Sequence, residues 1–197
     1  KLVLFGYGSG DVQAAFRKGG LVLWTATLAG ARSGQAIATI GGIGASPVIP
    51  RKRVYAANAS GRLVAMNLDS GARLWTAPHG ALTPLCVAGG SVFLINDIRQ
   101  LVRVDAHNGN TIWAVDLPTD KTSLSYRNTE VIAHHGPILA GDRLIVASGD
   151  GLLRQFDPVS GEELETVKIP GGATTSPIVA DGVLYVVSKN GKLHAFR

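Results

Sequence analysis

Short apolar stretches alternate with polar turns along the whole chain. In residues 46–78 the apolar stretches lie at 47–49, 54–57, 62–66 and 72–75, and charged residues, Ser or Gly separate them. Stretches this short, with alternating polarity and turn residues between them, are typical of antiparallel hairpins. No segment shows a sustained helical period. The pattern therefore predicts an all-β chain.

The same pattern recurs about every 40 residues, with one copy expanded. Each of the three Trp residues follows a Gly by four positions, and a fourth copy keeps the Gly but has Glu165 in place of Trp. A small residue followed by Pro marks the start of each copy. Four strands in a unit of this length are typical of a β-propeller blade. The structural repeat positions are Gly20, Trp24, Gly71, Trp75, Gly109, Trp113 and Gly161.

The strands of a blade are lettered A to D from the inside outwards. The chain is predicted to hold about 18 strands, or about four and a half blades. The first copy has strands B to D, three copies are complete, and the last has strands A to C. Because a start at strand B has no structural reason, we expect an N-terminal part of the ring to be missing. The domain is a partial β-propeller over 1–197, with blades at approximately 1–30, 45–78, 82–118, 136–170 and 175–197.

The repeated Gly and Trp have structural roles in this arrangement. Each Gly falls in the turn between strands C and D, where a residue with positive φ is required. Each Trp lies on the outermost strand and is predicted to be buried against the neighbouring blade.

Composition narrows the functional classes. Hydrophobic residues make up 46% of the 197 residues and charged residues 17%, with a net charge of +5. No apolar run reaches the roughly 18 residues that span a bilayer. The longest basic run, Arg51–Arg53, is interpreted as a solvated turn, so no nucleic-acid partner is expected. The single cysteine, Cys86, excludes an intramolecular disulfide and is predicted to be a small buried hydrophobe.

Candidate catalytic and metal-ligating groups are sparse. His134 and His135 are adjacent, and neighbours on a strand point to opposite faces, so they are not expected to chelate a metal. The run Gly6–Gly10 lacks the strand-to-helix context of a phosphate loop. No nucleophile elbow precedes a helix. We predict no catalytic residue, no metal site and no cofactor.

The repeat resembles the PQQ-like, or quinoprotein-type, propeller family. The family's blade motif is similar to Ala-x-Asp-x-x-Thr-Gly-x-x-x-Trp. It is matched here by residues 65–75 and 103–113, and in part by Asp157 with Ser160 and Gly161. The resemblance covers essentially the whole chain and implies the propeller fold. It does not imply quinone binding.

The order and spacing of the copies most resemble the BamB family, the propeller lipoproteins of the outer-membrane β-barrel assembly machinery. The similar segments are 136–148, with the expanded spacer before it, and 184–197. This resemblance implies an eight-bladed ring at the periplasmic face of the bacterial outer membrane, with this chain as its C-terminal half. It also implies a lipid anchor upstream of residue 1. The implied partners are a barrel-assembly subunit and unfolded outer-membrane proteins.

Two long spacers, 25–45 and 114–135, join strand D of one blade to strand A of the next. Strands alternate in direction, so these D–A connections share one face of the ring with the B–C turns. Long connections in compact domains are often functional, although they can simply cover blade edges. Members of the resembled family can carry acidic residues in the loop that matches 40–44, and none is present here. The predicted interface residues are Ile40, Gly42, Ile43, Gly44, Tyr126 and Arg127.

Three functional classes follow. A quinoprotein-type dehydrogenase would need a calcium cage and commonly a vicinal disulfide, and the lone Cys86 excludes the disulfide. A WD-type scaffold would carry Asp after Trp, and here Trp75 is followed by Thr. The predicted function is a non-enzymatic periplasmic scaffold that docks on partners in outer-membrane protein assembly. The alternative is a quinoprotein-type propeller with a ligand-binding or dehydrogenase role.

Overall fold

The computed structural model describes residues 1–28, 42–119 and 131–197. Every regular element within these ranges is a β-strand. In the same ranges, no helix is long and apolar enough to cross a membrane. The all-β prediction is confirmed.

The strands form five antiparallel sheets, one for each blade. Three sheets have three strands and two have four. Blade 1 contains β1 (Leu2–Gly6), β2 (Asp11–Phe16) and β3 (Val22–Thr27), and blade 2 contains β4 (Arg53–Ala57), β5 (Leu63–Asn67) and β6 (Arg73–Ala77). Blade 3 contains β7 (Cys86–Ala88), β8 (Ser91–Ile95), β9 (Gln100–Asp105) and β10 (Thr111–Asp116). Blade 4 contains β11 (His134–Ala140), β12 (Arg143–Ser148), β13 (Leu152–Phe156) and β14 (Glu163–Lys168). Blade 5 contains β15 (Ile178–Ala180), β16 (Val183–Val187) and β17 (Leu193–Phe196).

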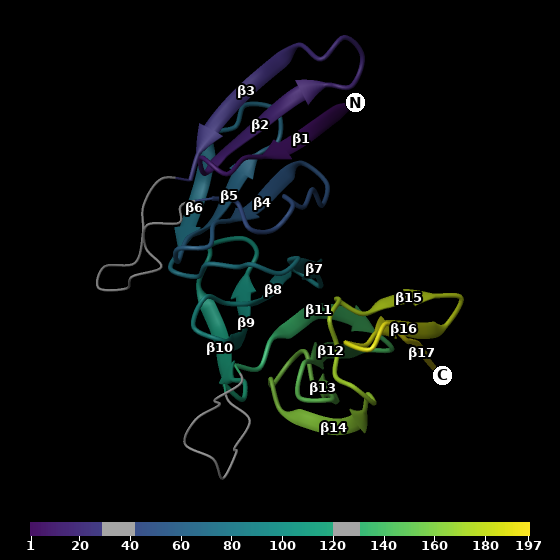
Figure 1. Cartoon of the computed structure of the whole chain (residues 1–197). Coiled ribbons are helices and arrows are strands. Elements are labelled where there is room, and N and C mark those ends of the chain that lie inside the picture. The colour runs from purple at the N-terminus through teal and green to yellow at the C-terminus, as the bar shows by residue number, and fades with distance from the viewer. Residues whose placement is uncertain (29–41, 120–130) are drawn as a thin grey trace.

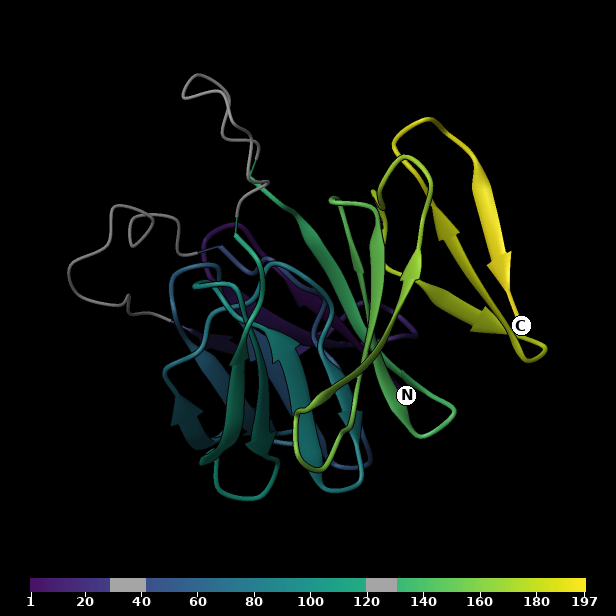
Figure 2. The ribbon, with the colours of Figure 1, turned by 90° about the horizontal axis from the view of Figure 1, so that it is seen from below.

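The blades follow one another in chain order along a curved array (Figure 1). Figure 2 shows the β11–β14 and β15–β17 sheets as two separate, splayed layers. In the two four-stranded sheets, strands B and C are each hydrogen-bonded on both sides.

One predicted strand is reduced to a single bridge. Strand A of blade 2 was expected at 47–49, but only Val48 pairs there, through two backbone hydrogen bonds of 2.9 Å with Tyr55. Pro47 and Pro50 flank this residue, and proline has no N–H to continue a ladder. The described residues therefore form 17 strands rather than the expected 18.

The core consists of apolar layers between neighbouring blades. Successive residues of a middle strand serve opposite neighbours, because strand side chains alternate. Leu101 packs toward Leu144 of blade 4, whereas Val102 packs toward Leu63 of blade 2, and all four are fully buried. Each such side chain contributes about 1.5–3 kcal/mol relative to exposure. Every internal blade is therefore held from both sides.

The two ends of the blades form two distinct faces. The D–A face carries the D–A connections and the B–C turns, and backbone hydrogen bonds join them: Leu28 donates to Gly10 at 2.8 Å and Ala81 donates to Asn58 at 2.9 Å. The A–B face carries the A–B and C–D turns at the opposite ends of the strands. Both long spacers start and end on the D–A face, as expected from strand direction.

Candidate functional site

The repeated Trp and Gly meet across blade boundaries. A Cβ added to Gly71 would lie 2.6 Å from the ring of Trp24 in the preceding blade. The corresponding distances are 2.7 Å from Gly109 to Trp75 and 2.9 Å from Gly161 to Trp113. A side chain at these positions would occupy the space of the indole ring. The Gly is therefore required for interblade packing as well as for its turn.

The same glycines also adopt the left-handed backbone that the turn needs. Their φ values are +67° at Gly20, +70° at Gly71, +83° at Gly109 and +80° at Gly161. Each donates its N–H to the residue four positions earlier, as Gly161 does to Asp157 at 2.9 Å. The four positions are structurally equivalent.

The three indoles differ in what their N–H groups contact. Trp24 Nε1 donates to the Leu68 carbonyl at 2.8 Å, and Trp75 Nε1 donates to the Ala106 carbonyl at 3.2 Å. Both rings are buried at 9% exposure. Trp113 is only half-buried, and its Nε1 is buried without a hydrogen-bond partner. The prediction of a largely buried Trp is thus right for Trp24 and Trp75 and too strong for Trp113.

The predicted interface residues on the first spacer lie at the boundary of blades 1 and 2. Ile43 is half-buried, packs against the core between these blades, and donates its N–H to Tyr7 at 3.1 Å. Gly42 accepts a hydrogen bond from Ala59 at 3.1 Å. A Cβ on Gly44 would lie 2.8 Å from the Ala81 carbonyl. These contacts give the three residues a structural role in holding the connection. Ile40, Tyr126 and Arg127 lie outside the described residues.

Exposed apolar side chains that the sequence analysis missed also lie on the D–A face. Leu82 is 65% exposed in the connection between blades 2 and 3, beside Gly44. Val131 is 55% exposed, Tyr7 43% and Ile98 38%. The only sequence signal was an apolar residue inside a short turn, such as Leu82 between Ala81 and Thr83. Assigning it to this face required the strand direction.

A polar group is buried where blade 4 meets blade 3. Arg154 donates to Asp150 at 2.5 Å, and both side chains are almost fully buried. Burial opposes ionisation of Asp150, but the Arg154 guanidinium outweighs it and holds the pKa of this carboxyl below its ordinary value. Nearby, His134 contacts the Ser148 hydroxyl at 2.7 Å and the Pro118 carbonyl at 2.8 Å. Burial lowers the pKa of His134.

These contacts leave the polar group internally satisfied. The Pro118 carbonyl can only accept, so His134 donates from Nε2 and accepts the Ser148 hydroxyl at Nδ1. The His135 ring is also partly buried, and burial lowers its pKa. Within the described ranges, no three His, Cys, Asp or Glu side chains are grouped so that they could hold a metal. Of these contacts, the hydrogen bond from His134 to Pro118 links blade 4 to the connection that leaves blade 3, whereas the pair of Arg154 and Asp150 lies within blade 4.

Cys86 is half-buried at the start of β7 rather than fully buried as predicted. It packs at the edge of the core between blades 3 and 4, because strand A is the innermost strand and has one side open. Burial raises the pKa of its thiol.

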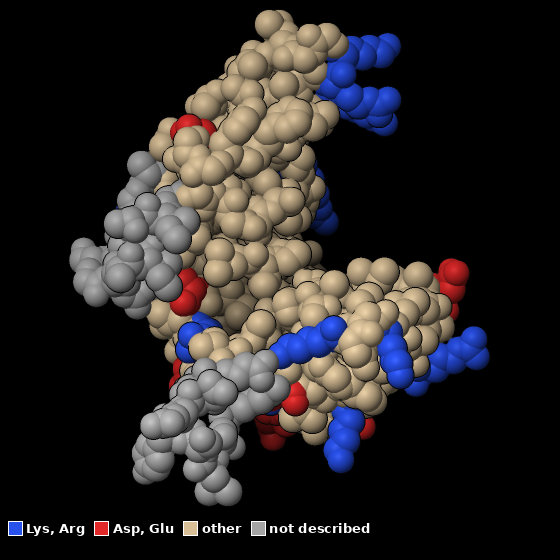
Figure 3. All heavy atoms as spheres, viewed as in Figure 1, with Lys and Arg blue, Asp and Glu red and all other residues tan. Residues whose placement is uncertain are grey.

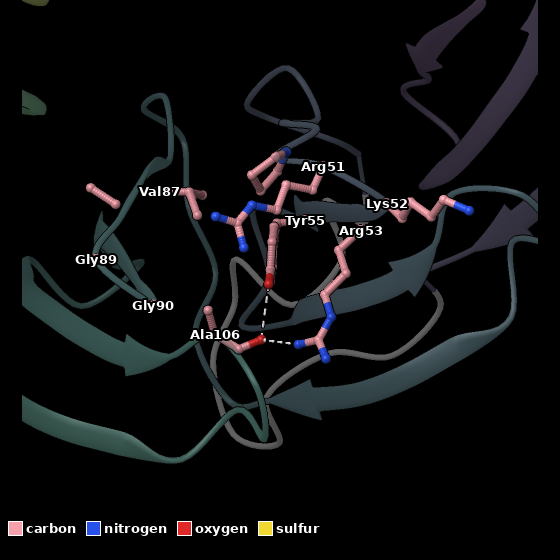
Figure 4. A pocket seen from close by; sticks show the side chains of 10 residues that line it. Arg51, Lys52, Arg53, Tyr55, Val87, Gly89, Gly90 and Ala106 are labelled. Atoms are coloured by element: carbon pink, nitrogen blue, oxygen red, sulfur yellow. Dashed lines mark hydrogen bonds between the residues drawn. The ribbon is translucent and has the colours of Figure 1, made fainter.

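A basic hollow opens on the A–B face between blades 2 and 3. Its volume is about 720 Å³. Tyr55, Val87 and Ala106 line it, and Arg51 lies at its edge. In Figure 4 the guanidinium of Arg51 extends over the hollow between Tyr55 and Val87, whereas Lys52 points away. Arg51 forms no ion pair or hydrogen bond with any part of the chain that the structure describes.

One wall of this hollow is held rigidly. The Ala106 carbonyl accepts hydrogen bonds from Arg53 at 2.8 Å, Tyr55 at 2.9 Å and Trp75 at 3.2 Å. Arg53 also contacts His107 Nδ1 at 3.1 Å. Because a guanidinium can only donate, His107 accepts at Nδ1. Three side chains of blade 2 are thus fixed to one carbonyl of blade 3.

A second hollow of about 490 Å³ lies at the same end of blade 1, lined by Lys1, Phe16, Arg17 and Lys18. In Figure 3, Lys and Arg side chains project from this end of the β1–β3 sheet. Among the described residues of blades 1 and 2, Asp69 is the one carboxylate on the A–B face. Its carboxylate lies 3.9 Å from the Lys52 ammonium, and both side chains are exposed. The A–B face of these two blades is therefore strongly basic.

The fold and the repeat residues together define the class: this is a β-propeller built from PQQ-like blades. The family model described as "Outer membrane protein assembly factor BamB" matches residues 1–115 and 100–197. The chain belongs to this family. The resemblance predicted from the blade motif is confirmed.

Curated relatives carry the same description. The chain is 26% identical over 189 residues to outer membrane protein assembly factor BamB of Shewanella oneidensis. The aligned region covers 95% of this chain and 45% of that protein. It is 27% identical over 192 residues to the BamB of Moranella endobia, covering 98% and 47%. The chain thus spans about half the length of the curated relatives it matches.

Solved structures support the fold. The crystal structure of BamB from Moraxella catarrhalis superposes with a TM-score of 0.81 at 20% identity, over 99% of this chain and 55% of that one. A quinohemoprotein alcohol dehydrogenase from Comamonas testosteroni gives a TM-score of 0.71 at 13% identity, over 99% and 39%. At these identities both likenesses show the propeller fold alone.

Proposed function

We propose that the chain forms part of a non-enzymatic periplasmic scaffold, which docks on partner proteins during assembly of outer-membrane β-barrels. Membership of the BamB family carries the proposal, because curated relatives of this family are described as outer-membrane protein assembly factors. The expected location is the periplasmic face of the outer membrane. The expected partner is the barrel-forming subunit of the assembly machinery.

The D–A face is the proposed docking surface. Both long connections emerge there, and so do the exposed apolar side chains of Tyr7, Leu82, Ile98 and Val131. Apolar and aromatic side chains of this kind commonly provide the central contacts of protein interfaces. The connection at Gly42–Gly44 is packed against the blades, so it supplies a rigid edge for this surface. Contact through apolar groups should depend only weakly on salt.

The proposal is tested by calorimetry with the purified periplasmic part of the barrel-forming subunit. Leu82→Asp should weaken binding at least tenfold, because it places a charge within an apolar contact. Ile43→Asp should also weaken binding, but Ile43 is half-buried and its substitution can disturb the fold. Leu82 is 65% exposed and is therefore the cleaner probe.

Leu21→Asp is the matched control. Leu21 is 70% exposed in the C–D turn of blade 1, on the A–B face, so its substitution should leave binding unchanged. If the Leu82 variant bound normally and the Leu21 variant bound more weakly, the docking surface would lie on the A–B face, and the proposal would be wrong.

The absence of enzymatic chemistry is tested separately. Protein dialysed after incubation with a quinone cofactor and Ca²⁺ should show no retained quinone absorbance and no dye-linked alcohol oxidation. A retained absorbance band with turnover would favour the quinoprotein-type alternative.

A further inference from the structure

We propose that the basic hollow between blades 2 and 3 binds an acidic, extended segment of a protein partner, with Arg51 as the residue that pairs with its carboxylate. The hollow lies on the A–B face, opposite the surface proposed for docking. It is lined by Pro50–Arg53 and Tyr55 from blade 2, and by Val87–Gly90 and Ala106 from blade 3.

The backbone at Arg51 departs from the other A–B turns. Arg51 has φ of +58°, a left-handed conformation that is uncommon for a bulky residue. The A–B turns of blades 3, 4 and 5 also contain residues with positive φ, but there they are Gly or Asp: Gly89–Gly90, Gly141–Asp142 and Asp181–Gly182. Gly and Asp tolerate this conformation far better than Arg. Non-glycine residues in this left-handed region cluster at functional sites, and at Arg51 this backbone carries a guanidinium that lies over a hollow.

The charge at this position is available to a ligand. Arg51 has no ion-pair partner in the described part of the chain, whereas Arg53 is held by Ala106 and His107. Arg53 thus fixes the wall, and Arg51 remains free at the opening (Figure 4). A planar guanidinium pairs well with a carboxylate in a bidentate geometry.

The lining selects a peptide rather than a small anion. Val87 and Ala88, both half-buried, offer apolar contacts beside the guanidinium, and the buried Tyr55 backs this wall. A Cβ at Gly89 or Gly90 would meet nothing within 4 Å, so this side of the hollow stays open. The second basic hollow on neighbouring blade 1 extends the positive surface in one direction. A segment of several residues, with a carboxylate flanked by apolar side chains, matches this combination of charge and shape.

The test measures fluorescence anisotropy of a labelled peptide of alternating Asp and Val residues, and of a Lys and Val peptide as its charge-reversed control. Wild-type protein should bind the acidic peptide and not the basic one, and affinity should fall as salt rises from about 50 to 300 mM. Arg51→Gly should raise Kd about tenfold or more. The same substitution should leave the melting temperature unchanged or higher, because Gly suits the left-handed backbone.

Arg143→Ala is the matched control, since Arg143 also borders an A–B turn but pairs with Glu165 at 3.2 Å in blade 4. Its acidic-peptide affinity should equal that of wild type. Equal affinity of the Arg51→Gly and wild-type proteins, or no acidic-peptide binding by wild type, would overturn the proposal. Binding to phosphatidylglycerol vesicles that is lost in Arg51→Gly, without peptide binding, would instead assign the hollow to an anionic lipid surface.

Discussion

The boundary between blades 2 and 3 and the boundary between blades 3 and 4 use the same repeat with different chemistry. At the first, Trp75 packs on Gly109, and the strand C position facing it is Val102, fully buried. At the second, Trp113 packs on Gly161, but Arg154 occupies the position equivalent to Val102. One boundary is apolar with a satisfied indole, and the other encloses an ion pair.

This difference shows which part of the repeat the fold depends on. The contact between Trp and Gly is present at both boundaries, whereas the residue on strand C varies from Val to Arg. A buried Arg is tolerated because Asp150 lies beside it and neutralises it. At these two boundaries the outer contact is kept, whereas the inner position accepts either Val or a charge that is paired.

Removing the indole should have the largest effect. Trp75→Ala is expected to lower the free energy of unfolding by about 3–5 kcal/mol, as truncation of large buried side chains does. Trp113→Ala should cost less, because Trp113 is half-buried. Denaturant titration measures both. A cost below about 1 kcal/mol for Trp75→Ala would contradict its role in packing.

Breaking the ion pair should have the next largest effect. Arg154→Met leaves Asp150 buried without its partner and is expected to cost about 2–4 kcal/mol. The double variant Arg154→Met with Asp150→Asn should recover most of this loss, because neither charge then remains. The coupling comes from a double-mutant cycle of unfolding free energies. Additive effects would show that the two charges do not depend on each other.

The indole N–H should distinguish the two Trp residues more finely. Trp75→Phe removes the hydrogen bond to the Ala106 carbonyl, whereas Trp113→Phe removes a buried N–H without a partner. Loss of the hydrogen bond should make Trp75→Phe more destabilising than Trp113→Phe by about 1 kcal/mol. Denaturant titration of both variants measures this difference. A larger loss of stability for Trp113→Phe than for Trp75→Phe would contradict the prediction.

Acidification should have a graded effect, bounded by the shift in the pKa of His134. Burial lowers the pKa of His134, so the unfolded chain binds its proton first, near the ordinary value of about 6.5. Stability should therefore fall as pH decreases below about 6.5, by at most about 1.4 kcal/mol per pH unit for this group. His134→Gln should make the decline shallower, with His135 supplying part of what remains. An unchanged slope in thermal melts from pH 7 to 5 would contradict this.

Repetition made the fold predictable. The spacing from Gly to Trp gives the C–D turn and the outer strand, because the turn needs positive φ and the indole needs a neighbour without a side chain. The short strand A at Val48 was harder to predict, since its apolar pattern resembles the other copies while its flanking prolines limit pairing. The local pattern therefore predicts the blades, but it overestimates the length of the innermost strand, as at Val48 in blade 2.

The candidate sites were less predictable because they depend on contacts between blades. The sequence shows that Arg51 is basic, but not that a left-handed backbone holds it over a hollow lined by a different blade. Leu82 likewise became visible only when strand direction assigned its turn to the D–A face. The partners of Arg154 and His134 are also set by neighbouring strands and connections, which spacing alone does not reveal.

The contact between Trp and Gly has a direction along the chain. Each of blades 1 to 3 supplies an indole to the blade that follows, and blades 2 to 4 each receive one on a glycine. Blades 2 and 3 carry both halves of this contact, so duplicating either would reproduce the existing boundary on each side. Propellers of this kind can thus change their number of blades by gene duplication without inventing a new interface. Glu165, at the Trp position of blade 4, marks a blade whose duplication would require a compensating substitution.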